Sequence, residues 1–408
     1  MRIRSITCFI HPRWPISELI FQKAGLFAQM AKQSFENEGY TVQTIRMATP
    51  PFSKFLTKQD YAQASAHIAV MAHSEGFEYV SLGPALTDQL ESYAVIPELL
   101  GLSGNLFFSG HLTTPHTEIN LPAVRACAEV IPQTAQLEAN GFANLRFAAL
   151  ANVPPWAPFF PAAYHQGSTS AFSLALEAAD LAVSAFTEAR SLEEARQNLV
   201  TRIETHAQAL QKVAQRLGDA YQVEFKGLDF TLAPFPQLDK SIGHALERLG
   251  LPAVGLPGSL AAAAFLTDTL DRATFKRTGF NSLMMPLLED ATLAARGAQG
   301  VLSVYDLLLY SAVCGTGLDT IPLPGDASVD QLYAVLLDLA ALALRLDKPL
   351  TARLIPVPGL QAGDETDFDF EFFANSKVLA LHAEPLTGLL VGEGNIPLNR
   401  RGNNQPMH

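Results

Sequence analysis

The chain alternates between short, continuously apolar runs and longer segments in which apolar residues recur every three or four positions. Runs of the first kind are typical of buried strands, and segments of the second kind predict amphipathic helices. The expected strands are residues 3–10, 41–47, 79–82, 106–108, 146–153, 222–232, 281–285, 320–323, 351–357 and 377–382. The expected helices are residues 16–37, 60–75, 121–139, 170–185, 192–217, 241–249, 259–270, 290–298, 301–313 and 329–346.

This alternation of strands and helices determines the predicted fold class. Because the strands are apolar along their whole length, both faces of their sheet should be covered, as in a mostly parallel α/β sheet. Roughly ten strands without an evident linker favour one α/β barrel, closed or nearly closed, over two domains. We therefore expect a single barrel domain over residues 1–400 and a flexible tail over residues 401–408.

Composition narrows the class of protein. Hydrophobic residues make up 48% and charged residues 17% of the chain, which excludes a disordered protein, and the net charge of −12 argues against a nucleic-acid partner. The amino-terminal apolar run is too short for a signal peptide, and the apolar helix at 331–346 is too short to cross a membrane. Cys8, Cys127 and Cys314 are odd in number and far apart, as expected of reduced thiols. We therefore expect a cytoplasmic protein.

Most of the expected strands run directly into loops that contain proline and ionisable residues. The longest of these loops covers residues 154–167, and others begin at residues 11, 109, 286 and 324. Loops at the carboxyl ends of parallel strands hold the ligands of α/β sheets and barrels. Proline can also simply end a strand. Because the pattern recurs in so many loops, we expect them to form one shared site.

The segment 314–326, CGTGLDTIPLPGD, combines a thiol and two carboxylates with three glycines and two prolines. Cys314 is expected at the end of a helix, with Gly315 as a left-handed cap. It is either a buried structural residue or a functional thiol, and the carboxyl end of a helix disfavours a thiolate. Asp319 and Asp326 are either turn or cap residues, or they act as acid, base or metal ligand.

Further candidates lie in the other loops. Glu289 is either a carboxylate favoured by the dipole of the helix that it opens, or a general base or metal ligand. The histidines form no His-Glu-x-x-His motif, so His165 is either structural or an acid–base or metal-binding residue. Arg13 and Lys240 could hold a carboxylate or phosphate. The candidates are, for catalysis, His165, Glu289, Asp326, Asp319 and Cys314; for substrate binding, Arg13, His11, His111, Tyr164 and Lys240; and for a divalent metal ion, His165, Glu289 and Asp326.

Several blocks of sequence resemble a known family. They are PFFPAAYH at 158–165, GLDFTLAP at 227–234, FNSLMMPLLED at 280–290 and the segment 314–326, together with RIRSIT at 2–7. The chain resembles the family called domain of unknown function 711, also uncharacterised protein family 0210. The resemblance implies a ten-stranded α/β barrel similar in shape to pyruvate formate-lyase-like glycyl radical enzymes, and it implies no reaction. The region 388–395, GLLVGEGN, lacks the Arg-Val-x-Gly-Tyr/Phe type motif of those enzymes, so radical catalysis is not expected.

Two classes of function follow from these observations. The first is a non-redox enzyme, a hydrolase or lyase, that acts on a small polar metabolite or sugar by acid–base chemistry, with or without a divalent metal ion. In this reading His165 and Glu289 are acid and base, Asp319 and Asp326 orient groups or bind an ion, and Arg13 holds an anionic group. The second is a catalytically inactive barrel that binds a metabolite or protein partner as a regulatory module. In either case a homo-oligomer is expected.

Overall fold

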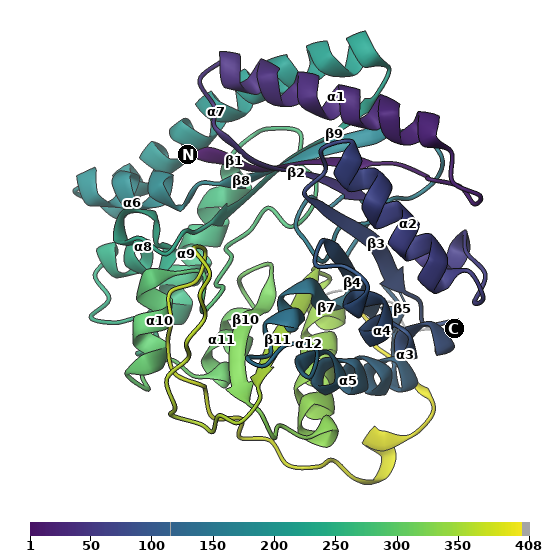
Figure 1. Ribbon diagram of the computed structural model, residues 1–408. Helices are drawn as coiled ribbons and strands as arrows, with labels where there is room; N and C mark the ends of the chain where they lie inside the picture. Colours follow the sequence, from purple (N-terminus) through teal and green to yellow (C-terminus); the bar gives the residue numbers. More distant parts are fainter. Residues whose placement is uncertain (115, 402–408) are drawn as a thin grey trace, which may run out of the picture.

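The computed structural model describes residues 1–114 and 116–401, and within them nine strands form one mainly parallel sheet (Figure 1). The tail expected at 401–408 lies outside the described residues, apart from residue 401. The strands, in spatial order, are β10 (Gly317–Pro324), β11 (Leu350–Val357), β7 (Phe147–Ala151), β4 (Leu106–His111), β3 (Tyr79–Ala85), β2 (Val42–Ala48), β1 (Arg2–Phe9), β8 (Ala171–Glu177) and β9 (Glu224–Ala233).

The strands of this sheet run in two directions. The central group β7, β4, β3, β2 and β1 is parallel throughout, and so are the pairs β10/β11 and β8/β9. The junctions β1/β8 and β11/β7 are antiparallel. The carboxyl ends of the central strands therefore lie at one end of the sheet, and those of the four outer strands lie at the other. The expectation that all post-strand loops share one site is wrong for this reason.

The sheet is not closed into a barrel by regular strands in the described residues. Its edges are β9 and β10, and an irregular segment at 276–288 lies between them. Leu228 N, in β9, donates to Lys276 O at 2.8 Å, and Leu287 N donates to Asp319 O, in β10, at 3.0 Å. The strands expected at 281–285 and 377–382 are replaced by irregular backbone with isolated bridges. The mixed α/β class is thus confirmed, whereas the ten-stranded closed barrel is not observed.

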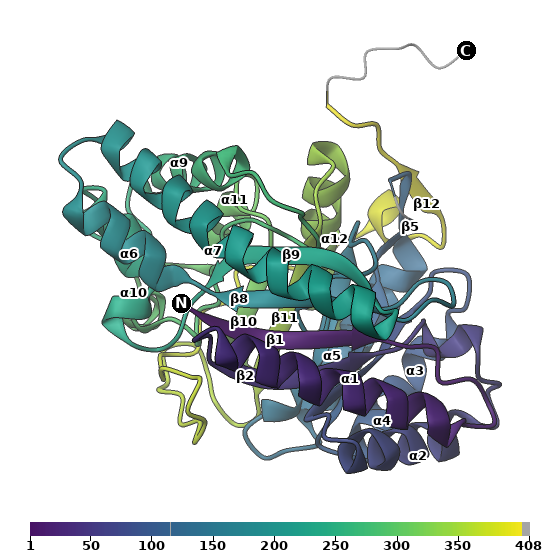
Figure 2. The same ribbon diagram turned by 90° about the horizontal axis from the view of Figure 1, so that it is seen from above.

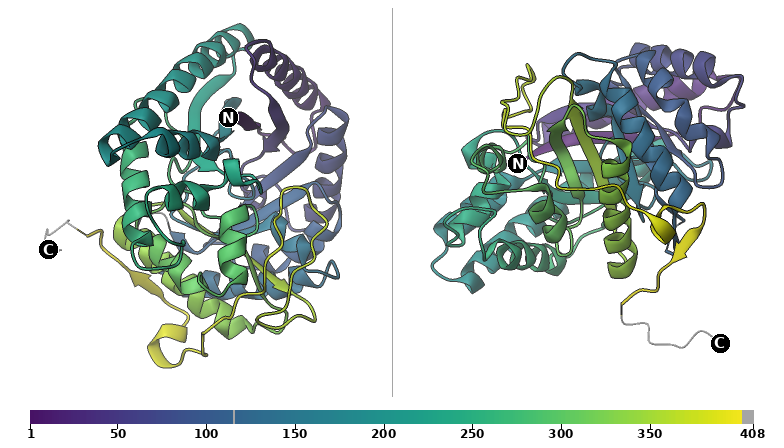
Figure 3. Two further views of the ribbon diagram at one scale, coloured as in Figure 1. Left: turned by 90° about the vertical axis from the view of Figure 1, so that its left-hand side faces the viewer. Right: turned by 90° about the horizontal axis from the view of Figure 1, so that it is seen from below.

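Helices form an outer layer around the curled sheet (Figure 3). The long helix α1 packs on β1 and β2, and the long helix α7 packs on β9 and on α1 (Figure 2). Local signals explain where several begin: α12 starts with a capping box in which Ser328 accepts from Gln331 N. The helices are α1 (Glu18–Asn37), α2 (Tyr61–Ser74), α3 (Glu91–Ala94), α4 (Ile96–Gly101), α5 (Leu121–Ala135), α6 (Ala179–Glu188), α7 (Leu192–Tyr221), α8 (Ile242–Arg248), α9 (Ser259–Arg272), α10 (Ala291–Ala298), α11 (Val304–Tyr310) and α12 (Val329–Leu346).

The segment predicted as one helix at 170–185 folds as strand β8 followed by helix α6. Its sequence, AFSLALE over 171–177, favours a helix locally because it is rich in alanine and leucine. Every residue of β8 is buried, and the strand pairs with β1 on one side and β9 on the other. Sheet pairing and burial therefore override the local helix propensity.

The carboxyl-terminal part of the chain contains little regular structure. It runs over the outside of the molecule and ends beside a small second sheet of β5 (Thr113–Thr114), β6 (Glu118–Asn120) and β12 (Asn395–Pro397) (Figure 1). Strand β12 pairs antiparallel with β6 and thereby fastens this segment to the body of the protein. Among the described residues, no helix is both long and apolar enough to cross a lipid bilayer.

The proline-rich loop between β7 and β8 lies inside the curled sheet. Residues 157–165 of this loop are buried, and hydroxyl groups from the strands hold its backbone. Ser5 and Thr7 of β1 both donate to Pro158 O, at 3.2 and 3.0 Å, and Ser81 of β3 donates to Ala163 O at 2.7 Å. This interior loop separates the space within the sheet into two regions, one where the central strands begin and one where they end.

Candidate functional site

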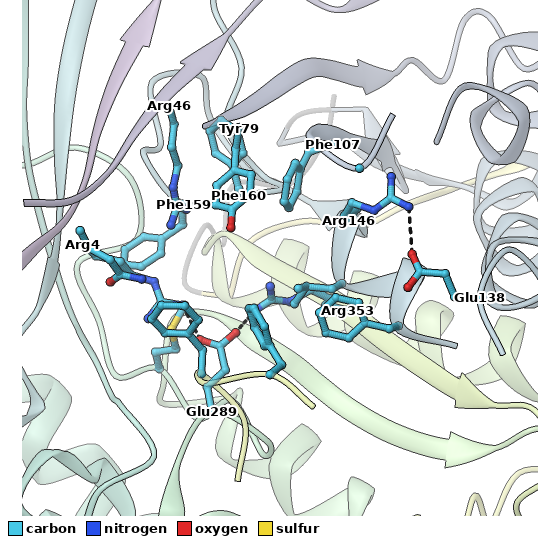
Figure 4. Close-up of a pocket in the computed structure, with 17 residues that line it drawn as sticks. Arg4, Arg46, Tyr79, Phe107, Glu138, Arg146, Phe159, Phe160, Glu289 and Arg353 are labelled. Carbon is cyan, nitrogen blue, oxygen red and sulfur yellow. Dashed lines mark hydrogen bonds and ion pairs between the residues drawn. The ribbon is translucent and has the colours of Figure 1, made fainter. Parts of the chain in front are cut away.

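A cavity of about 230 Å³ lies inside the sheet, at the end where the central strands begin. Charged and aromatic side chains from segments far apart in the sequence converge on it (Figure 4). The interior loop contributes Phe159 and Phe160 to its wall. The charged lining residues are Arg4, Arg46, Arg146, Arg353, Glu138 and Glu289, and the aromatic ones are Tyr79, Phe107, Phe142, Phe159, Phe160, Phe370 and Phe372.

Glu289 joins two of these arginines in a buried ion-pair network. One carboxylate oxygen accepts from Arg4 Nη2, and the other accepts from Arg353 Nη2 at 2.7 Å. Arg353 Nε also donates to Asp319 Oδ1 at 2.6 Å. Glu289 is 2% exposed and Asp319 is 4% exposed. Charge-assisted bonds of this kind are strong, and the network depends on every buried charge keeping its partner.

The pKa values of the two carboxyl groups of the network are shifted in opposite directions. Burial alone would raise the pKa of Glu289, but the positive charges of Arg4 and Arg353 outweigh it and hold that pKa below its ordinary value. Burial raises the pKa of Asp319 against the opposing charge of Arg353, and the negative charge of Glu289 raises it further. Glu289 is therefore a fixed negative charge, whereas Asp319 is the group suited to exchanging a proton.

Arg46 differs from the other three arginines because no carboxylate pairs with it among the described residues. It is 7% exposed, its Nε donates to Thr44 Oγ1 at 2.8 Å, and its guanidinium lies 5.5 Å from the ring centre of Tyr79 and 5.3 Å from that of Phe160. Burial and the neighbouring charge of Arg4 lower the pKa of Arg46 to about 9, so it remains charged at neutral pH. Glu289 and Glu78 act on Arg46 only from beyond ion-pair distance, so this buried cation would gain from a bound anion.

The fourth arginine, Arg146, has a partner at the rim of the cavity. Its Nη2 donates to Glu138 Oε1 at 3.3 Å, and the Glu138 side chain is 39% exposed. When Asp319 is included, the cavity and its network contain four positive and three negative side chains, an excess of one positive charge. In a chain whose net charge is −12, this local excess indicates a site for an anion.

The loop 366–376 brings Phe370 and Phe372 to the cavity. Asn375 fixes the shape of this loop, because its Oδ1 accepts from Phe368 N at 2.8 Å and its Nδ2 donates to Phe368 O at 3.1 Å. The ring of Phe372 also meets that of Phe235, in the loop after β9, with ring centres 5.8 Å apart. The loop therefore forms an aromatic cover that is anchored at its base.

Of the residues predicted from the sequence, Glu289 and Asp319 meet in this network. Sequence reasoning missed Arg4, Arg46 and Arg353, which supply its positive charges. A signal for them exists, since each lies within a segment that the sequence predicts as a buried strand. A charged residue that a strand carries into the interior needs a partner there.

The histidine candidates lie beyond the interior loop, where the central strands end. His165 N donates to Thr49 O, just after β2, and its Nε2 lies 2.9 Å from Thr169 O. Burial lowers the pKa of His165, and it lowers the pKa of His111 to about 4, so both rings are neutral near pH 7. His165 and Glu289 therefore lie at opposite ends of the strands and do not form the expected acid–base pair.

The other residues predicted at the histidine end make local contacts. Tyr164 donates its hydroxyl to Val153 O at 2.9 Å, and its ring meets the edge of His111. His11 Nδ1 accepts from Arg13 N at 3.3 Å, and Arg13 is exposed. These four residues lie outside the cavity lining.

Three further candidates lie away from the cavity. Lys240 Nζ donates to Gln237 Oε1 at 3.0 Å, and the exposed Asp326 accepts from Gln361 Nε2 at 3.3 Å. Cys314 is buried, and burial raises the pKa of its thiol. The left-handed glycine after it is Gly317, with φ of 91°, and not the expected Gly315.

The predicted metal site is not assembled. Within residues 1–114 and 116–401, no group of three histidine, cysteine, aspartate or glutamate side chains is placed to hold a metal ion. His165 lies at one end of the strands, Glu289 is engaged by two guanidinium groups, and Asp326 is exposed. The ligand set His165, Glu289 and Asp326 therefore does not fit a shared ion in this arrangement.

Comparison with known proteins identifies the family. The family model described as "Uncharacterised ACR (DUF711)" matches residues 1–375. The chain belongs to the DUF711 family. A UPF0210 protein of Pyrobaculum aerophilum is 32% identical over 354 residues, which cover 81% of this chain and 76% of the relative. UPF0210 proteins of Syntrophobacter fumaroxidans and Oenococcus oeni are 27% identical over 380 residues and 26% identical over 402 residues, covering 86% and 93% of this chain and 82% and 88% of the relatives.

These matches confirm the family resemblance of the sequence blocks. The names of the DUF711 family and of its UPF0210 relatives specify no reaction. The function therefore has to be argued from the cavity and its charges.

Proposed function

We propose that the interior cavity is the functional site and that it binds a small organic anion. The observation that carries this proposal is Arg46, a buried cation that lines the cavity and has no carboxylate partner among the described residues. An anion at this position would balance the excess positive charge and turn an unfavourable buried cation into an ion pair.

The proposed activity is that of a non-redox enzyme, a hydrolase or lyase, with Asp319 as the acid–base group. One oxygen of Asp319 accepts from Arg353, while no hydrogen bond to Oδ2 occurs among the described residues. A small void that Asp319 lines shares Phe159, Phe160 and Arg353 with the main cavity. A carboxyl group with a raised pKa beside an anion site suits proton transfer to or from a bound metabolite. Glu289 then serves as a positioning residue, because it holds Arg4 and Arg353.

The second candidate is a receptor that binds the same anion without chemistry. The clamp on Glu289 favours it, because a carboxylate held between two guanidinium groups is a poor base. Such a receptor would have evolved from an enzyme similar in shape to pyruvate formate-lyase-like enzymes by losing its catalytic activity.

The experiment that separates these candidates uses a mixture of small anionic metabolites and mass spectrometry. An enzyme is expected to consume one of them, and Asp319→Asn should retain that metabolite without consuming it. A receptor would retain a metabolite unchanged in both forms. Arg46→Met should retain nothing in either case, whereas Arg125→Met, a surface arginine stacked on Tyr333, should behave like the wild type. Retention that does not depend on Arg46 contradicts the proposed function.

We also propose that the protein acts in the cytoplasm as a homo-oligomer. Cys8, Cys127 and Cys314 are free and buried, as expected in a reducing compartment. Helix α1 exposes Leu19, Leu26 and Met30, with exposed fractions of 57%, 60% and 41%, and such a patch supports contact between copies. Light scattering after size-exclusion chromatography tests this part, and a mass of 44.1 kDa, that of a monomer, contradicts it.

A further inference from the structure

The charged side chains around the cavity have an excess of one positive charge, which one negative group on a ligand would balance. Arg4 and Arg353 already share Glu289 and Asp319, and Arg146 pairs with Glu138, so Arg46 alone accounts for the excess. One carboxylate would neutralise it. A phosphate monoester carries about −1.5 to −2 charges at neutral pH and would leave negative charge buried without a partner.

Arg46 presents its guanidinium end-on. Its Nε is engaged by Thr44, which leaves Nη1 and Nη2 as two parallel donors that match the two oxygens of a carboxylate. The rings of Tyr79 and Phe160 lie within cation–π distance of the guanidinium and limit its movement. Gln43, from the same strand, also lines the cavity, and its buried Oε1 has no hydrogen-bond partner among the described residues. An amide oxygen only accepts, so it is available to an N–H or O–H group of the ligand and not to its carboxylate.

The rest of the cavity suits a flat apolar ring. Aromatic rings outnumber aliphatic side chains, represented by Leu145 and Met284, among its described lining residues. Two of its walls are edge-to-face pairs, Phe107 with Phe160 at 5.4 Å between ring centres and Phe142 with Phe370 at 5.0 Å. Such pairs accept a further ring in the same geometry. An apolar cavity of about 150 Å³ admits benzene, so about 230 Å³ holds one six-membered ring with a short acid side chain.

The geometry points to an aromatic monocarboxylate as the ligand, with its carboxylate on Arg46 and its ring among the phenylalanines. This inference rests on the proposed function, that the cavity binds an organic anion, and adds the chemical class. In the enzyme reading, Asp319 exchanges a proton with the bound aromatic acid. In the receptor reading, the same class of compound is the signal.

Calorimetric titration of the full chain with four probes tests the inference. Phenylacetate has both parts of the ligand, phenylacetamide lacks the charge, acetate lacks the ring, and inorganic phosphate is the alternative anion. Phenylacetate is expected to bind at least about tenfold more tightly than each of the other three, because each lacks a contact that the cavity offers. Arg46→Met should weaken phenylacetate binding by at least about tenfold, and Arg125→Met should leave it unchanged. Circular dichroism checks that each variant is folded.

A variant of the aromatic cover gives an independent test that leaves the buried charges intact. Phe370→Leu should weaken phenylacetate several-fold and leave the weak binding of acetate unchanged. If acetate or phosphate binds as tightly as phenylacetate and this binding needs Arg46, the aromatic class is wrong and the proposed anion site stands. If no probe binds the folded wild type, or if Arg46→Met binds phenylacetate as the wild type does, the anion site is wrong as well.

Discussion

Replacing Arg46 by methionine should make the ligand-free protein more stable. Arg46 is buried, and no carboxylate pairs with it in the described part of the chain. Methionine keeps a flexible apolar side chain of similar reach, so the change removes the charge with little change in packing. If the site binds an anion, the charge of Arg46 lowers the stability of the ligand-free protein and is kept because it binds the ligand.

The expected gain follows from the structure. Burial and the charge of Arg4 lower the pKa of Arg46 from its ordinary value to about 9. At about 1.4 kcal/mol for each pKa unit, keeping the side chain charged costs about 5 kcal/mol at any pH below 9. The variant loses the hydrogen bond to Thr44, about 1.5 kcal/mol, and the stacking on Tyr79 and Phe160, about 0.5–1 kcal/mol each. The remaining difference is a stabilisation of about 2 kcal/mol.

Urea unfolding followed by tryptophan fluorescence measures this change, since Trp156 lies in the interior loop. Arg125→Met is the matched control. Its guanidinium also stacks on a tyrosine, 4.3 Å from the ring centre of Tyr333, and it pairs with Asp330, which is 52% exposed. Because this pair faces water, the control should lose up to about 1 kcal/mol.

The sign of the change in unfolding free energy tests whether Arg46 lacks a counter-charge. If Arg46→Met destabilises the ligand-free protein by more than about 1 kcal/mol, the buried charge is already compensated and the case for an anion site fails. The difference in stability between Arg46→Met and the wild type should also depend on whether ligand is present. At a concentration of one hundred times Kd, an anion adds about 2.7 kcal/mol to the wild type and nothing to the variant, so the difference between the two should close.

Two further predictions concern charges whose partners are known. Glu289→Gln should cost about 3–5 kcal/mol of unfolding free energy, because Arg4 and Arg353 remain charged and buried, whereas Glu138→Gln at the exposed rim should cost less than about 1 kcal/mol; equal losses in urea unfolding would contradict the buried network. Burial lowers the pKa of His111 to about 4, below the value of about 6.5 in the unfolded chain. Between these two pH values the unfolded state binds more protons than the folded state. The free energy of unfolding should therefore fall by about 3 kcal/mol as the pH drops from about 6.5 to about 4. His111→Gln should remove this part of the pH dependence of unfolding, and an unchanged profile would show that the ring is not buried as a neutral group.

The regular elements could largely be predicted from the sequence because their signals are local. The helices expected at 16–37, 192–217 and 329–346 appear as α1, α7 and α12 with ends shifted by at most a few residues. Helical periodicity and capping residues lie within the segment that they specify. The strands expected at 3–10, 41–47, 79–82, 106–108 and 146–153 appear as β1, β2, β3, β4 and β7, because each is a short, largely apolar run bounded by turns.

The arrangement of the site could not be predicted, and one segment explains much of the error. When residues 170–185 are taken as a helix, every remaining strand can be parallel, and all post-strand loops then face one end. Strand β8 pairs antiparallel with β1 and reverses the direction of β8 and β9. This reversal places His165 and Glu289 at opposite ends of the sheet, although each lies in a loop after a predicted strand, at 146–153 and 281–285. Strand direction depends on pairing between distant segments, which periodicity does not contain.

The charge balance of the cavity is also a property of the fold rather than of any local pattern. Arg4 and Glu289 are 285 residues apart, and Arg353 and Asp319 are 34 apart. The sequence shows an arginine within each of three predicted buried strands, which predicts that each arginine needs a partner. Only the folded arrangement shows that Arg4 and Arg353 share Glu289 and that, within residues 1–114 and 116–401, no carboxylate lies within ion-pair distance of Arg46. A search for the function of this protein should therefore begin with Arg46, because no carboxylate of the described residues pairs with it and a bound anion would supply that partner.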